Sequence, residues 1–146
     1  MDQFQNISRV YKKSVEKIQD YPDDREVDRY VENSERFVEL LKESKRVIWV
    51  GTGRQEQMAD FAARLTKANN KTTFCSKDSS IPYEYNPDDL VVALSSSGET
   101  ERTLHYAEFA FKSISESTPV VAITTNENSS LAQLSEKTGG FVVKIP

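Results

Sequence analysis

The sequence holds little of what marks several large classes of protein. Its 146 residues include one cysteine, Cys75, and one histidine, His105. A single cysteine excludes a disulfide within the chain, and the lack of a Cys or His cluster excludes the usual zinc sites. The sequence therefore predicts a protein that works without a metal and without a cofactor.

Long hydrophobic runs and an excess of positive charge are also missing. No apolar run approaches the roughly 18 residues that a membrane-spanning helix needs, and the N-terminus lacks the hydrophobic region of a signal peptide. The net charge is −4, with 19 Lys and Arg interspersed among 23 Asp and Glu, so there is no basic stripe for nucleic acid. We expect a cytoplasmic protein that binds neither membrane nor nucleic acid.

The first third of the chain has the rhythm of helices. Apolar residues recur at helical spacing between residues 4 and 18, and the stretch Tyr21–Asp24 breaks this pattern. A second helix is predicted from about residue 25 to residue 43. We therefore divide the chain into an N-terminal helical segment, residues 1–45, which packs or dimerises, and a ligand-binding domain, residues 46–146.

The rest of the chain alternates between strands and helices. Short β-branched runs predict strands at 46–50, 72–75, 90–94, 120–123 and 141–145, and helices are predicted at 55–68, 99–112 and 129–136. Uniformly apolar strands separated by helices are typical of a parallel sheet covered on both faces. The predicted fold is α/β: a three-layer α/β/α sandwich of the flavodoxin or Rossmann type with a five-stranded parallel sheet, preceded by two helices.

The loop after the first of these strands carries two glycines. It reads Gly51-Thr52-Gly53-Arg54, and a glycine pair is common in tight strand-to-helix turns. A dinucleotide fingerprint needs a third glycine where this chain has Glu56, and the lysine of a P-loop is also missing. All four loop residues are candidates for substrate binding, although a surface ion pair explains Arg54 equally well.

The loop after the third strand, Ser95-Ser96-Ser97-Gly98-Glu99-Thr100, is called the serine loop below. One serine before a helix is most often an N-cap, but capping needs neither three serines in a row nor the glycine. Free N–H groups and the helix dipole favour a bound anion at such a place, and hydroxyl groups add neutral donors. We predict that Ser95, Ser96, Ser97 and Thr100 bind a phosphate monoester.

These motifs together resemble those of a known family. The serine loop resembles the SxSGET phosphate loop of sugar isomerase (SIS) domains. Three other stretches also resemble that family: Val50–Arg54 its glycine loop, Asp89–Leu94 its third strand, and Ala122–Asn126 with Ser129–Ala132 its fourth-strand turn. The resemblance covers about Val47 to Ile145. The sequence is most similar to 6-phospho-3-hexuloisomerases, whose glycine loop reads GxGRSG where this chain has Gln55 and Glu56.

The resemblance implies a sugar phosphate as the small-molecule partner and a metal-free isomerisation through an enediol. The family's GETxTP loop aligns with Lys77–Pro82, which places Asp78 where the family has its glutamate. A catalytic base must lie within hydrogen-bond reach of the proton that it removes. Glu99 and His105 are further catalytic candidates. Glu99 is equally explained as a helix-start carboxylate, and His105 as a surface or subunit-interface residue.

Two classes of function stay open at this point. One is a phosphosugar isomerase, which Asp78 and Pro82 favour. The other is a non-catalytic, sugar-phosphate-binding regulatory module. It is favoured because this sequence ends at Pro146, whereas family members continue into a further C-terminal helix. Without that helix, and with apolar stripes on the N-terminal helices, we expect a homodimer or homotetramer. The residues expected to bury apolar surface there are Phe4, Val10, Phe37 and Leu41.

Overall fold

The computed structural model describes residues 24–77, 81–82, 84–112 and 118–145. The first predicted helix and Asp78 lie outside these residues. The chain divides into two compact units, Met1–Lys42 and Glu43–Pro146. The first unit holds nearly all of helix α2, Asp24–Glu43. No helix in the described part of the chain is long and apolar enough to cross a membrane.

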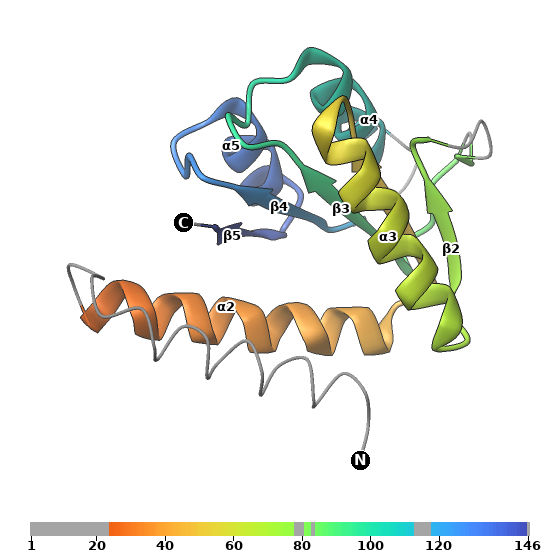
Figure 1. Ribbon diagram of the computed structural model, residues 1–146, viewed down its shortest axis with the longest axis horizontal. Coiled ribbons are helices and arrows are strands. Elements are labelled where there is room, and N and C mark those ends of the chain that lie inside the picture. Colours follow the sequence, from red (N-terminus) through yellow and green to blue (C-terminus); the bar gives the residue numbers. More distant parts are fainter. Residues whose placement is uncertain (1–23, 78–80, 83, 113–117, 146) are drawn as a thin grey trace. The chain divides into compact units, whose positions relative to one another are not determined.

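The second unit is built on a five-stranded parallel sheet (Figure 1). Its strands are β1 (Arg46–Gly51), β2 (Thr72–Cys75), β3 (Asp89–Leu94), β4 (Val120–Thr124) and β5 (Phe141–Lys144), in the order β2-β1-β3-β4-β5. The predicted fold is confirmed, and the ends of the strands lie within one residue of those expected. From β1 the chain turns to β2 on one side, and from β3 it turns to β4 on the other. Such a switch point leaves a crevice beyond the carboxyl ends of the two strands.

Helices cover the two faces of the sheet. Helices α4 (Glu101–Lys112) and α5 (Ser130–Lys137) share one core with Ile48 and Val50 of β1 and with neighbouring side chains of β3, β4 and β5. Because side chains alternate along a strand, Val47 points to the opposite face. Helix α3 (Arg54–Ala68) lies on that face, since Thr73, the register partner of Val47, donates a hydrogen bond to the Ala63 carbonyl at 3.3 Å.

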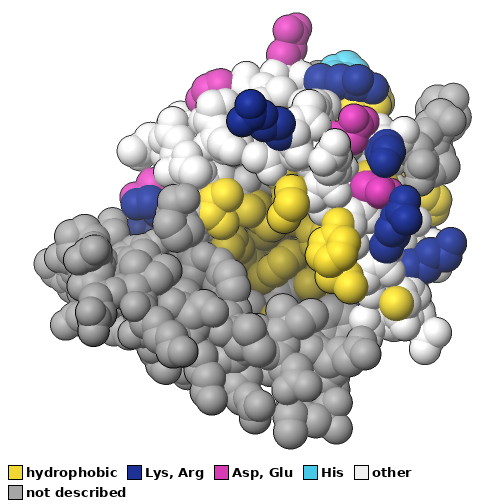
Figure 2. All heavy atoms as spheres, viewed as in Figure 1, with side chains coloured by type: hydrophobic (Ala, Val, Ile, Leu, Met, Phe, Trp, Pro, Cys, Tyr) yellow, Lys and Arg dark blue, Asp and Glu magenta, His cyan; other side chains and the backbone are white. Residues whose placement is uncertain are grey.

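The outer side of α3 is unusually apolar. Met58, Phe61 and Leu65 are 56%, 59% and 44% exposed and recur three and four residues apart, which places them on one stripe. Figure 2 shows hydrophobic side chains gathered on this face of the molecule. Of the residues expected to bury surface in an oligomer, Phe4 and Val10 lie outside the described residues, while Phe37 and Leu41 lie on α2. The oligomer stays a prediction.

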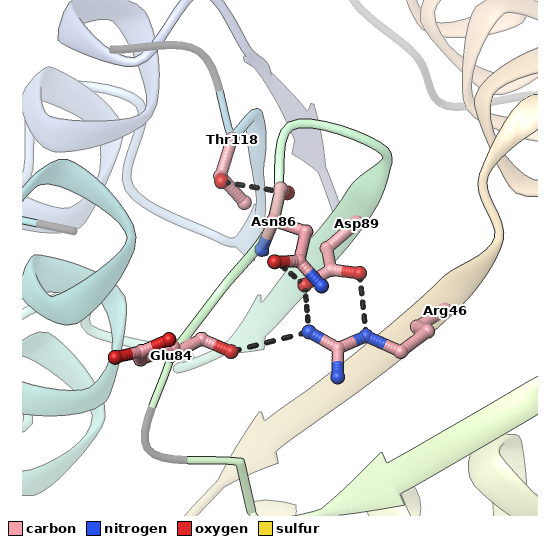
Figure 3. Close-up of polar contacts among 5 residues, drawn as sticks. All are labelled: Arg46, Glu84, Asn86, Asp89 and Thr118. Atoms are coloured by element: carbon pink, nitrogen blue, oxygen red, sulfur yellow. Dashed lines mark hydrogen bonds and ion pairs between the residues drawn. The ribbon is translucent and has the colours of Figure 1, made fainter. Parts of the chain in front are cut away.

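Two ion pairs join β1 to β3 at the amino edge of the sheet. The Asp89 carboxylate is buried and accepts from Arg46 Nε at 2.7 Å and from an Arg46 Nη at 2.5 Å (Figure 3). The backbone N–H of Asn86 also donates to the Asp89 carboxylate, at 2.6 Å. The same Arg46 Nη donates to the Glu84 backbone carbonyl at 3.1 Å. Lys45 and Asp88, each one residue before the start of its strand, form a second pair, which is exposed.

Candidate functional site

Three loops meet at the carboxyl edge of the sheet, because parallel strands all end on the same side. They follow β1, β3 and β4 and lead into α3, α4 and α5 (Figure 1). The glycine loop is the first and the serine loop is the second. The third, residues 125–129, is called the β4–α5 loop below. The chemistry that the sequence places in these three loops is therefore gathered at one end of the unit.

The serine loop folds back on itself through the Ser95 side chain. Ser95 is buried, and its hydroxyl lies 2.9 Å from the Thr100 hydroxyl and accepts from the Gly98 amide at 3.0 Å. The exposed Ser97 hydroxyl accepts from the Glu99 amide at 3.2 Å. Ser95 and Thr100 are therefore in contact, with the Ser95 side chain buried, while Ser97 is exposed in the same loop. Phosphate binding by these residues stays a prediction.

The first amides of α4 have no acceptor among the described residues, whereas those of α5 are all used. At α5, the amides of Ser130, Leu131, Ala132 and Gln133 donate to Glu99, to the Gly98 carbonyl, and to the Ser129 hydroxyl and carbonyl. At α4, the amides of residues 100–103 meet no acceptor among the described residues, and the same holds for the amides of Ser96 and Ser97. Unsatisfied amides at a helix start attract an anion. Of these two helices, α4 is the one able to bind it.

The β4–α5 loop holds the serine loop in place through one carbonyl. The Ser96 carbonyl accepts from the Thr125 amide at 3.1 Å, the Thr125 hydroxyl at 2.7 Å and the Thr124 hydroxyl at 3.0 Å. Ser97 carries the N–H of the same peptide group. Hydrogen bonds accepted by a peptide carbonyl polarise the group and strengthen its N–H as a donor. Thr124 and Thr125 therefore support the donor that the serine loop presents.

Gly98 allows the closest approach between these two loops. Its φ is +70°, and a Cβ added there would lie 2.0 Å from Ser129 Oγ and 2.3 Å from Ser129 Cβ. Ser129 is fully buried and caps α5, so it has no room to move aside. Only glycine fits at position 98, for both reasons.

Glu99 contacts α5 with both of its carboxylate oxygens. One accepts from the Ser130 amide at 2.8 Å and the other from the Ser130 hydroxyl at 2.6 Å. The hydroxyl bond, followed by the amide bond, lowers the pKa of Glu99 below its ordinary value of 4.5. A carboxylate held in this way, with a lowered pKa, is a weak base at neutral pH. These contacts match the structural role that the sequence allowed for Glu99, and its catalytic role stays a prediction.

The glycine loop contacts the serine loop and α4 through side chains. The Thr52 hydroxyl lies 3.2 Å from the hydroxyl of Thr103 on α4, and Gln55 Nε2 donates to Ser96 Oγ at 2.7 Å. Gly51 is buried and exchanges two hydrogen bonds with the Ser76 hydroxyl, while Gly53 has a φ of +61° at the start of α3. Arg54 is exposed and forms no ion pair within the described part of the chain. All four predicted substrate-binding residues therefore lie at this edge.

Of the three predicted catalytic residues, His105 and Glu99 lie in the described part of the chain. His105 is exposed on α4, where its ring packs edge-on against Phe109 with the ring centroids 5.1 Å apart. No hydrogen bond joins His105 to Glu99, and Asp78 lies outside the described residues. In the described ranges, no group of three His, Cys, Asp or Glu residues could hold a metal ion.

Sequence reasoning missed several contributors to the site. Gln55 appeared only as a departure from a motif, and Thr124, Thr125, Ser129 and Ser130 only as part of a resemblance. The partners of Gln55, Thr124, Thr125 and Ser130 lie 28 to 41 residues away in sequence, so no local spacing rule connects them. The signal that could have found them is the density of Ser, Thr and Asn directly after a buried strand.

Comparisons with known proteins agree with this arrangement. A family model described as SIS domain matches residues 40–138. An uncharacterized HTH-type transcriptional regulator of Thermotoga maritima is 32% identical over 110 residues, which cover 73% of this chain and 38% of that protein. The chain thus spans about two fifths of the length of this relative.

Two solved structures are similar across nearly the whole chain. One is a hypothetical protein from Methanococcus jannaschii, for which a function of 3-hexulose-6-phosphate isomerase is inferred. It has a TM-score of 0.69 and 17% identity, and the match covers 98% of this chain and 72% of that one. The other is the Vibrio vulnificus NanR protein complexed with ManNAc-6P. Its TM-score is 0.68 at 22% identity, over 98% of this chain and 49% of that one.

Proposed function

The chain belongs to the SIS domain family, and from this premise we propose that it binds a sugar phosphate, with the phosphate group held by the serine loop at the start of α4. The observation that carries the proposal is the row of amides without an acceptor there. The amides of Ser96, Ser97 and residues 100–103 meet no acceptor among the described residues, whereas the start of α5 is fully satisfied.

The chemistry of these donors suits a phosphate monoester. The helix dipole and several converging N–H groups favour a negative group without needing a lysine or arginine. The Ser97 and Thr100 side chains are exposed beside them and add hydroxyl groups. A free sugar offers no anion and so gains little from the helix dipole.

The similar proteins support the same kind of ligand. The Vibrio vulnificus protein was solved with ManNAc-6P, and the Methanococcus jannaschii protein is linked to 3-hexulose-6-phosphate. Both names denote phosphorylated sugars. A panel of sugar phosphates in a thermal-shift measurement would identify the ligand that this chain prefers, because a ligand that binds only the folded state raises its stability.

Replacing Ser97 with alanine, or Thr100 with valine, is expected to weaken binding of the preferred sugar phosphate. Each lost hydrogen bond to the anion should cost about 1–3 kcal/mol, since bonds to charged groups are stronger than neutral ones. Isothermal titration calorimetry on each variant would measure the loss.

Thr72→Val is the matched control for this experiment. Thr72 is exposed at the amino end of β2, at the far edge of the sheet, so its replacement should leave binding unchanged. The unphosphorylated sugar should bind poorly to every variant. Equal affinity for the phosphorylated and the free sugar would contradict the proposal.

Within this function, we favour a sugar-phosphate-binding module over an enzyme. Glu99 is hydrogen-bonded to Ser130, and His105 is exposed on α4, so neither of these two candidates favours a role as the base. The relative from Thermotoga maritima, named as a transcriptional regulator, favours a sensing role as well. The second candidate is a metal-free phosphosugar isomerase of the 6-phospho-3-hexuloisomerase type, with Asp78 as its base.

Asp78→Asn separates the two candidates. If the chain isomerises its ligand, this substitution is expected to abolish turnover by removing the base while leaving binding intact, and EDTA should have no effect. Turnover of the preferred sugar phosphate, followed by NMR, and the affinity from calorimetry would be measured together. No turnover by the unaltered chain would support the module. Turnover unchanged by Asp78→Asn would exclude Asp78 as the base.

A further inference from the structure

We propose that Gln55 is a positioning residue that fixes the Ser96 hydroxyl as a hydrogen-bond donor to the bound phosphate. The proposal rests on the proposed function and extends it to a residue outside the serine loop. Gln55 lies in the first turn of α3 and reaches across to the serine loop, 41 residues further along the chain.

The geometry assigns Ser96 the role of acceptor toward the protein. Gln55 Nε2 donates to the Ser96 hydroxyl at 2.7 Å, and Thr124 and Thr125 donate to the Ser96 carbonyl. A hydroxyl has one proton to give. Because Gln55 occupies an acceptor position of Ser96 Oγ, the proton of this hydroxyl points away from Gln55. The Ser96 amide also meets no acceptor in the described part of the chain.

This arrangement matters because the charged oxygens of a phosphate group only accept hydrogen bonds, so they need donors in the protein. A serine hydroxyl that rotates freely must be ordered when the ligand binds, and that ordering reduces the affinity. Gln55 orders it beforehand. The side-chain amide of Gln55 thus acts on the ligand through Ser96. In this way α3 contributes to the phosphate site at the start of α4.

The decisive experiment is a double-mutant cycle between Gln55 and Ser96, with inorganic phosphate as the probe. Gln55→Met keeps the length of the side chain and removes its hydrogen bond, and Ser96→Ala removes the hydroxyl. We expect Gln55→Met to weaken phosphate binding about three- to tenfold in the unaltered background. In the Ser96→Ala background it should change the affinity less than twofold, because the hydroxyl on which it acts is gone.

A second variant tests the direction of the hydrogen bond. Gln55→Glu has nearly the same shape, but its carboxylate can only accept, so it takes the Ser96 proton away from the ligand. This variant should bind phosphate more weakly than Gln55→Met. Gln57→Glu is the control. Gln57 is exposed on α3, and this substitution adds the same negative charge away from the contact with Ser96. It should stay within about twofold of the unaltered chain.

The measurements are an NMR titration with inorganic phosphate, which follows the amide signals of Ser96 and Ser97, and an unfolding curve for each variant. Equal loss of affinity for Gln55→Met with and without the Ser96 hydroxyl would overturn the proposal, since Gln55 would then act independently of Ser96. So would a loss of affinity that only follows a loss of stability. If the unaltered chain binds neither inorganic phosphate nor any sugar phosphate, the proposed function fails, and this inference fails with it.

Discussion

Asp89→Ala is expected to lower the free energy of unfolding by about 3–5 kcal/mol, the usual cost of removing one partner from a buried ion pair. The Asp89 side chain is 1% exposed, and the Arg46 side chain that it binds is 25% exposed. Its loss would remove the acceptor of Arg46 Nε and of the Asn86 backbone N–H, at the point where β1 and β3 begin. It would leave the guanidinium with the Glu84 carbonyl as its only acceptor among the described residues. Urea denaturation of the variant would measure the change.

The neighbouring pair, one residue before the start of each of these strands, provides the control. Lys45 and Asp88 are 2.5 Å apart, but their side chains are 77% and 57% exposed. Water screens such a pair, so Asp88→Ala should scarcely change the midpoint of denaturation. If Asp88→Ala and Asp89→Ala lowered the free energy of unfolding by similar amounts, burial would not be what distinguishes the two ion pairs. Phosphate binding, at the opposite edge of the sheet, should survive in both folded variants.

Gly98→Ala is expected to damage the serine loop more than any loss of a single hydroxyl. The new Cβ would lie 2.0 Å from Ser129 Oγ, and the φ of +70° disfavours a residue with a side chain. Backbone strain and overpacking together should lower the free energy of unfolding by about 2–5 kcal/mol. Because the loop must shift to relieve the overlap, phosphate affinity should fall by at least about tenfold, as for the loss of one strong hydrogen bond.

Gly139→Ala separates strain from overlap. Gly139 has a similar φ of +74°, but an added Cβ would meet nothing within 4 Å. Only the backbone cost of about 1–2 kcal/mol should remain, and phosphate binding should be unchanged. Calorimetry and denaturation on both variants would provide the comparison. An alanine at position 98 that binds phosphate normally would show that the serine loop does not need its observed shape.

The fold was predictable because its signals are local. The apolar runs that form β1, β3 and β4 are continuous and buried, and the helical patterns between them end at glycine, serine or asparagine. Their order along the chain then leaves few arrangements, because parallel crossovers are right-handed. The position of the serine loop follows from the same reasoning, since loops after parallel strands share one edge.

The side-chain contacts within the site were not predictable, because they join residues of different loops. A run of three serines does not reveal that Ser95 turns inward while Ser97 stays exposed. Glu99 could be a base or a structural carboxylate until Ser130, 31 residues later, is seen beside it. Gln55 shows the same limit, because its partner Ser96 belongs to another loop. Side chains of these types bind whichever neighbour the tertiary structure supplies.

The start of α5 also bears on how the unit moves. Two of its first amides are held by the serine loop itself, through Glu99 and the Gly98 carbonyl. The serine loop therefore cannot swing outward without breaking both hydrogen bonds that it makes with the start of α5. Opening of the loop thus carries an added cost at this helix end, and local openings of this kind set how fast a region fluctuates. A ligand that reduces the motion of the serine loop would also reduce the motion at the start of α5, which it does not contact.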